Sequence, residues 1–326
     1  MSFTPPPPGA SREELEAALA APTSFLREAS GLNGGEPIPG LADCDLEAAL
    51  DGARHEFVRH RGLAVHLEIH EAARGAPTVV IHHGLGDHVR RFTPLAGMLA
   101  EAGFNTVALD RPGHGLSQGH RGHCPLPWAL DLVDSSVAFA RSRFGGPVIL
   151  LGDSLGGITL WYALTLEVDA DAVLCHCIGH PEVDLDSSMR WKQPLMKASG
   201  TLLPKAPIPV RHIADYDEVA LEPATQKAFD SERDDVFNFK VTAGSAASYI
   251  GFRPGIPWAR VTTPAAVWIG AEDRMVTPEF TRRSYEREHP PGAELDELAG
   301  MGHQVFLDHL AAAFPRFLDW TDRALA

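Results

Sequence analysis

The sequence has little positive charge for its length. Its 326 residues include 28 Lys and Arg against 43 Asp and Glu, which gives a formal net charge of -15. A surface with this balance repels phosphate backbones and anionic lipid headgroups. Nucleic acids and acidic membranes are therefore not expected as partners.

Long apolar runs are also missing. The sequence holds no stretch of about eighteen apolar residues, so it predicts no membrane-spanning helix and no stable membrane insertion. The first residues, MSFTPPPPGASREELEAALAA, lack the basic start and the apolar segment of a secretory signal. These features predict a cytoplasmic protein.

Cysteine is scarce, with four residues at positions 44, 124, 175 and 177. They form no CxxC pair of the kind that holds zinc, and a chain of this size needs no disulfide to fold. Cys175-His176-Cys177 lies in an apolar, strand-like run, which favours buried thiols over a metal site. The cysteines therefore fit a reducing compartment.

What the sequence does contain is a regular alternation of short apolar strands with helical stretches. After a predicted hairpin at 54–71, strands are expected at 78–83, 104–110, 147–154, 171–178, 264–273 and 293–299. Helices are expected at about 92–102, about 127–143, after Leu155, after Pro278 and from about 304 to 325. This alternation predicts an α/β fold with a mostly parallel sheet covered by helices on both faces.

Two segments depart from the alternation. Residues 1–53 are rich in Pro, Gly, Ala and acidic residues, with one short helical pattern at about 13–20, and they form an N-terminal extension. Residues 180–260 mix Pro, Met and aromatic residues without alternation, which predicts an inserted cap, or lid. The predicted core then consists of residues 54–179 and 261–326.

The strongest chemical signal is the G-x-S-x-G sequence around Ser154. It follows a predicted buried strand and precedes a predicted helix, which is the context of a nucleophile elbow. Small residues two positions away on each side allow the sharp turn that exposes the serine hydroxyl. The other interpretation, a glycine-rich helix start that binds phosphate, lacks the lysine of a P-loop. Ser154 is therefore the predicted nucleophile.

A serine nucleophile needs a base, and the base needs a carboxylate to orient it. Asp273 follows the predicted strand 264–273, with Glu272 as its main competitor for the role of the acid. His303 follows the strand 293–299 in a loop with flanking glycines, and it is the predicted base. The order Ser, acid, His is the one expected for this type of fold.

Backbone amides are predicted to stabilise the oxyanion. One is the amide of Leu155 at the start of the helix after the nucleophile, and the other is that of Leu85 in the loop 82–88. That loop contains three histidines and Asp87, so a metal site is a less favoured alternative. The turn at 110–117 follows another strand end, and its charged residues are expected to brace the site.

Together, the segments HHGLGDHVRRF, DRPGHGLSQG, GDSLGG, GAEDRMV and GMGHQVF resemble the monoacylglycerol lipase and lysophospholipase branch of the α/β-hydrolases. The resemblance extends from about Glu56 to the C-terminus and is loose across the cap. It implies a triad of Ser154, Asp273 and His303, a mobile cap over an acyl pocket, and no metal or organic cofactor. Family members commonly have His before the nucleophile and Met after it, whereas this chain has Asp153 and Leu155.

The predicted function is that of a serine hydrolase that cleaves a carboxylic ester, such as a monoacylglycerol, through an acyl-enzyme on Ser154. An aminopeptidase or amidase is the first alternative, because the same triad cleaves amides. An acyltransferase and a non-catalytic small-molecule-binding protein are two further alternatives. The expected partner is a small-molecule acyl ester, and the N-terminal extension leaves open whether the chain forms a homodimer or covers its own site.

Overall fold

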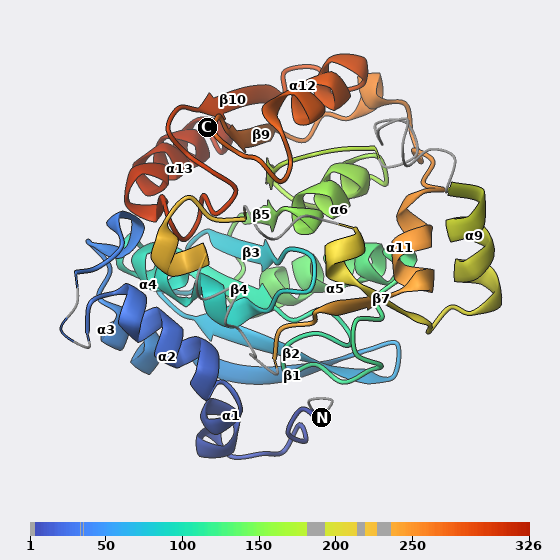
Figure 1. Ribbon diagram of the computed structural model, residues 1–326. Helices are drawn as coiled ribbons and strands as arrows, with labels where there is room; N and C mark the ends of the chain where they lie inside the picture. Colours follow the sequence, from blue (N-terminus) through green and yellow to red (C-terminus); the bar gives the residue numbers. More distant parts are fainter. Residues whose placement is uncertain (1–3, 33, 35, 181–192, 214–218, 227–235) are drawn as a thin grey trace.

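The central sheet is mostly parallel, as the alternation predicts (Figure 1). The computed structural model describes residues 4–32, 34, 36–180, 193–213, 219–226 and 236–326. Within this part of the chain, eight strands form one sheet in the order β1-β2-β4-β3-β5-β6-β9-β10. The first two strands run antiparallel to their neighbours, and the pairs from β4 to β10 are parallel.

The strands lie close to their predicted positions. Their bounds are β1 Arg54–His60, β2 Leu63–His70, β3 Thr78–His82, β4 Asn105–Leu109, β5 Val148–Asp153, β6 Ala172–His176, β9 Ala265–Gly270 and β10 Glu294–Leu298. Strands β1 and β2 form the expected hairpin, and its turn residues Arg61 and Gly62 both have positive φ, at 50° and 81°. A two-residue turn of this kind matches the twist of the strands that it joins.

The central strands are apolar on both faces because helices cover both faces. On β3, Val80 contributes to the core that includes α5 and α6, while Ile81 contributes to the core that includes α4 and α13. The covering helices are α4 Thr93–Glu101, α5 Leu126–Phe144, α6 Leu155–Leu164, α12 Pro278–Arg287 and α13 Leu310–Ala324, with the short 3-10 helices η2 Val89–Phe92 and η4 Trp258–Arg260. This arrangement confirms the predicted α/β class.

The N-terminal extension contains more helix than its composition predicted. Its elements are α1 Arg12–Ala18, α2 Ala20–Ala29, η1 Pro39–Leu41 and α3 Leu46–Gly52. Helix α1 begins with a capping box in which Ser11 and Glu14 each accept a hydrogen bond from the other's backbone amide. Buried side chains of α2, η1 and α3, including Leu26, Leu41 and Leu46, join the core beside α4 and α13. This packing into the shared core accounts for the additional helices.

The prediction for the last helix was wrong in its first six residues. Helix α13 begins at Leu310, and residues 304–309 form turns in which Leu307 and Asp308 donate to the carbonyl of Gln304. Three consecutive residues here, 305–307, are all buried. Contacts with distant residues hold these turns: the ring of His309 accepts a hydrogen bond from the amide of Gly302, and Gly40 packs against the carbonyl oxygen of Leu307.

Residues 180–260 contribute α9 Gln193–Leu202, β7 Pro207–Pro209, η3 Val210–His212, β8 Lys240–Thr242 and α11 Ala243–Tyr249. Strands β7 and β8 pair antiparallel in a small sheet of their own, and α9 packs on α11 (Figure 1). Among the helices described, none is both long and apolar enough to cross a lipid bilayer.

Candidate active site

The loop between β5 and α6 has the strained backbone of a nucleophile elbow. Ser154 stands between the two elements with φ 51° and ψ -116°, a conformation that costs a non-glycine residue free energy. The flanking glycines have no room for a side chain. A Cβ on Gly152 would lie 2.6 Å from the backbone of Gly156, and a Cβ on Gly156 would lie 2.0 Å from the carbonyl oxygen of His82. The G-x-S-x-G spacing is thus required by packing at this turn.

The structure brings the three predicted triad residues together. His303 Nε2 lies 3.1 Å from Ser154 Oγ, and His303 Nδ1 lies 2.7 Å from Asp273 Oδ2. The other carboxylate oxygen of Asp273 accepts hydrogen bonds from the amides of Met275 and Val276, at 2.9 and 2.8 Å. Asp273 is buried, whereas its competitor Glu272 is exposed. The acid beside His303 is therefore Asp273.

Burial and charge act in opposite directions on this pair. Burial alone would raise the pKa of Asp273, but the charge and hydrogen bond of His303 lower the pKa below its usual value. Burial alone would lower the pKa of His303, but Asp273, then Asp153 and Asp87, raise the pKa above its usual value. The site therefore favours an ionised Asp273 next to an imidazole of increased basicity, as a general base requires.

Arg111 braces the loop after β3. Its guanidinium group donates to the carbonyl oxygen of His83 at 2.9 Å and also to that of Gly84, and its own amide donates to His83 Nε2 at 3.1 Å. Leu85 follows in the same loop, and Leu85, Leu155 and Ser154 line one cavity. These contacts fit the expectation that the turn at 110–117 braces the site. That the amides of Leu85 and Leu155 hold the oxyanion stays a prediction.

Comparisons with known proteins identify a family and several relatives. The protein family described as "Serine aminopeptidase, S33" matches residues 74–309. A monoacylglycerol lipase of Mycolicibacterium smegmatis is 30% identical over 235 residues, which span 70% of this chain and 81% of that protein. The human monoglyceride lipase is 37% identical over 84 residues, 24% of this chain and 27% of that protein.

The chain belongs to the serine aminopeptidase S33 family.

Solved structures show the same fold. The monoacylglycerol lipase of Paleococcus ferrophilus has a TM-score of 0.64 at 23% identity, with 80% of this chain and 99% of that chain covered. The monoglyceride lipase of Saccharomyces cerevisiae has a TM-score of 0.66 at 14% identity, with 84% and 95% covered. The chain therefore has the α/β-hydrolase fold. Its relationship to monoacylglycerol lipase makes it a carboxylic ester hydrolase.

Ser154 opens onto an apolar cavity of about 350 Å³. Core residues in its wall include Leu155, Ile158 and Phe280, and the segment 180–260 contributes Met196, Ile213, Val241, Ala246, Tyr249 and Ile250. The family resemblance implied an acyl pocket under a cap without assigning its residues. Of the described residues in the wall, none carries a carboxylate.

The sequence did not indicate that His176 and Cys177 lie at this site. Both cysteines of the Cys175-His176-Cys177 run are buried free thiols, as predicted. However, β6 ends at His176, and Cys177 has a positive φ of 64° that places its Sγ 3.6 Å from Asp273 Oδ2. Because β6 neighbours β5, its carboxyl end had to lie beside Ser154, and this was the available signal.

Four side chains here have the chemistry of metal ligands. The ligand atoms of His176, Cys177, Asp273 and His303 lie within 4.8 Å of one another, and this is the one such group found in the described part of the chain. Hydrogen bonds among these residues already account for their closeness. The histidines of the loop 82–88 do not gather in this way, since His82 contacts Ser136 and His83 contacts Gly84.

Proposed function

We propose that the chain hydrolyses acyl esters of monoacylglycerol type, with Ser154 as nucleophile, His303 as general base and acid, and Asp273 as the carboxylate that orients His303. The observation that carries this proposal is that Ser154 Oγ, 3.1 Å from His303 Nε2, opens onto an apolar cavity that fits an acyl chain. Two relatives are a monoacylglycerol lipase and a monoglyceride lipase, which supports monoacylglycerol as the substrate class.

The reaction follows from the positions of these atoms. His303 Nε2 takes the proton of Ser154 as the serine oxygen bonds to the ester carbonyl carbon, and Asp273 stabilises the imidazolium. The amides of Leu85 and Leu155 hold the oxyanion. His303 then protonates the leaving alcohol, which departs with the bonding electrons of the carbon–oxygen bond. Water, deprotonated by His303, attacks the carbonyl carbon of the acyl-enzyme. The bond from that carbon to the Ser154 oxygen breaks, the oxygen takes the proton back from His303, and the carboxylic acid is released.

Residues 180–260 act in this proposal as a cap over the acyl chain, in one unit with the core at 54–179 and 261–326. The support is that α9, β8 and α11 each contribute to the cavity wall. The N-terminal extension has a different role, because its described residues are absent from that wall and pack into the core instead.

The first test is hydrolysis of a series of p-nitrophenyl esters, from acetate to palmitate, together with fluorophosphonate labelling. Wild-type protein is expected to prefer medium or long chains and to be labelled. Ser154→Ala is expected to lose label and about 10⁴-fold or more in turnover with its fold intact. Ser135→Ala, an exposed serine on α5, is the matched control and should behave as wild type. Undiminished activity in Ser154→Ala would refute the proposal.

The family description keeps aminopeptidase activity as the alternative. An aminopeptidase must hold the ammonium group of its substrate, which calls for a carboxylate near the nucleophile. Asp87 and Asp153 lie close to the site, but they line a separate small cavity and not the one that Ser154 faces. Acyl esters should therefore be cleaved faster than aminoacyl arylamides, and the reverse preference would favour the alternative.

A further inference from the structure

Asp153, the residue before the nucleophile, pairs with a second histidine. Asp153 Oδ1 lies 2.8 Å from Nδ1 of His176, and both residues are buried, at 8% and 0% exposure. The pairing follows from the sheet, because Asp153 on β5 and His176 on β6 are partners in the parallel register. A buried polar pair of this kind, at the ends of two central strands, is costly to bury, so it calls for an explanation.

The pair continues into the triad. His176 Nε2 lies 3.4 Å from Cys177 Sγ, and the Cys177 thiol donates to Asp273 Oδ2 at 3.6 Å. Asp273 holds His303, which meets Ser154, and Ser154 is bonded to Asp153 through the backbone. The contacts therefore close a ring that joins the elbow, the end of β6, the acid loop and the histidine loop.

The carboxylate of Asp153 also lies next to the loop that supplies the predicted oxyanion amide. A Cβ built on Gly84 would be 3.3 Å from Asp153 Oδ2, which places this oxygen against the loop backbone. A negative charge here favours a protonated His303 and opposes an oxyanion. The bond from His176 Nδ1 fixes the carboxylate in place and partly offsets its charge.

We propose that Asp153 and His176 are positioning residues for ester hydrolysis: together they fix the elbow to the acid loop, and they place the Asp153 carboxylate next to the imidazole ring that faces His303. This inference rests on the proposed roles of Ser154 and His303. The titratable and charged groups that face His303 are Asp273, Asp153, Asp87 with its partner Arg91, His176 and Cys177.

Removal of the charge alone tests this role. In Asp153→Asn, the amide oxygen can still accept from His176, while the negative charge near His303 is lost. The pKa of His303 should fall, so the acidic limb of kcat/KM against pH should move to lower pH, by about half a unit to one unit. The pH dependence of the fluorophosphonate labelling rate should show the same displacement.

His176→Gln tests the closed ring of contacts between the elbow and the acid loop. It leaves the Asp153 carboxylate without its imidazole, and we expect kcat to fall about 10-fold while KM changes little, because the reacting groups are misplaced. His120→Gln, an exposed histidine, is the matched control. A purely structural role predicts lower thermal stability in both site variants with an unmoved acidic limb, and that result would overturn the inference. Failure of the proposed function is distinct, because activity and labelling would then survive in Ser154→Ala.

Discussion

Two buried pairs of aspartate and histidine in this molecule are almost identical in geometry. Asp273 and His303 are 2.7 Å apart at the active site, and Asp110, just after β4, is 2.7 Å from His66 on β2. Each pair has both side chains almost fully buried. A search for carboxylate–imidazole contacts would not separate them, so the difference must lie in what the second ring nitrogen faces.

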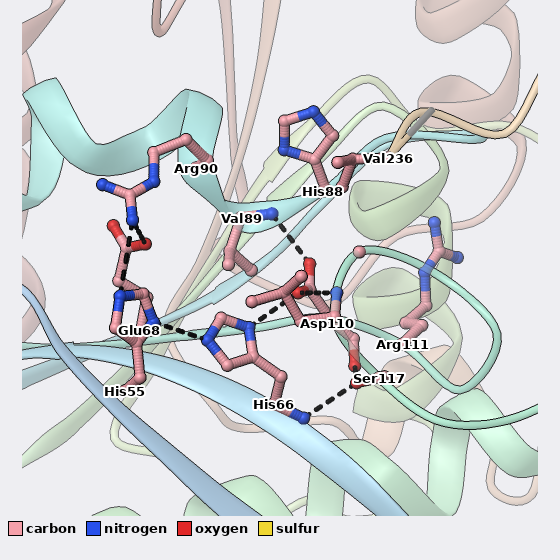
Figure 2. Close-up of polar contacts among 12 residues, drawn as sticks. His55, His66, Glu68, His88, Val89, Arg90, Asp110, Arg111, Ser117 and Val236 are labelled. Atoms are coloured by element: carbon pink, nitrogen blue, oxygen red, sulfur yellow. Dashed lines mark hydrogen bonds and ion pairs between the residues drawn. The ribbon is translucent and has the colours of Figure 1, made fainter. Parts of the chain in front are cut away.

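At the active site, the second nitrogen of His303 meets a hydroxyl that opens onto a cavity. At the other pair, Nε2 of His66 lies 2.8 Å from His55 Nδ1, and His55 Nε2 lies 2.9 Å from Glu16 on α1. Figure 2 shows His55, His66 and Asp110 in a row, with Arg90 alongside. Both ends of this second chain are carboxylates, so it has no nitrogen left to take a proton from a substrate. We infer that the hydrogen-bonded series at the active site takes part in the reaction, and that the series from Asp110 to Glu16 stabilises the fold.

Asp110 also closes two loops. Its carboxylate accepts hydrogen bonds from the amides of Val89 and Leu116, at 2.9 and 2.8 Å, as well as from His66. Burial alone would raise the pKa of Asp110, but the hydrogen bond and charge of His66, with the charges of His83 and His88, lower the pKa far below its usual value. An acid held in this way is a structural element of the loops on either side of the site.

The largest effect should come from breaking the reactive pair. Asp273→Asn keeps the shape of the acid but favours the wrong tautomer of His303, so kcat/KM should fall about 10⁴-fold. The unfolding midpoint in urea should change little by comparison. Steady-state hydrolysis and urea denaturation on the same preparation check both parts, and a loss of activity below 10-fold would count against the triad assignment.

The opposite pattern is expected for the structural pair. Asp110→Asn removes a buried charge from His66 and should lower the free energy of unfolding by about 3–5 kcal/mol. Protein that remains folded should keep its fluorophosphonate label, since Asp110 does not contact the triad in the described structure. Unchanged stability with lost labelling would mean that the comparison between the two pairs is wrong.

The sequence was sufficient to predict that Asp273 and His303 lie together beside Ser154, because all three residues follow strand ends. Ser154 follows β5, Asp273 follows β9 and His303 follows β10. The carboxyl ends of parallel strands meet at one edge of the sheet. Local glycines and the order of the residues supplied the rest. No detail of side-chain packing was needed for this prediction.

The structural pair and the ring at Asp153 could not be predicted in the same way. His66 meets Asp110, and Asp153 meets His176, only because particular strands are neighbours in a particular register. The helices of the extension also depend on distant contacts, since their buried leucines pack beside α13 at the opposite end of the chain. Sequence periodicity contains none of this long-range information.

The smallest effect concerns Glu16, which ends the structural chain. Burial alone would raise its pKa, but hydrogen bonds and charge from His55 and Arg90 lower the pKa of Glu16 from 4.5 to about 2. A carboxyl group whose pKa is lower in the folded state than in the unfolded state stabilises the fold at pH values above the unfolded-state pKa. For Glu16, this stabilisation is lost as the pH falls from 4.5 toward 2.

Glu16→Gln should therefore remove only part of the acid sensitivity of the protein. Because Glu16 is 28% exposed, solvent screens its charge, and the expected loss near neutral pH is about 1 kcal/mol. Urea denaturation at pH 7 and pH 3.5 should show a smaller difference between the two pH values in Glu16→Gln than in wild type. Glu13→Gln, an exposed glutamate on the same helix, should leave that difference unchanged. An equal effect of both substitutions would show that the acid sensitivity depends on the net charge of helix α1 alone. The hydrogen-bonded series from Glu16 to Asp110 would then not act as a unit.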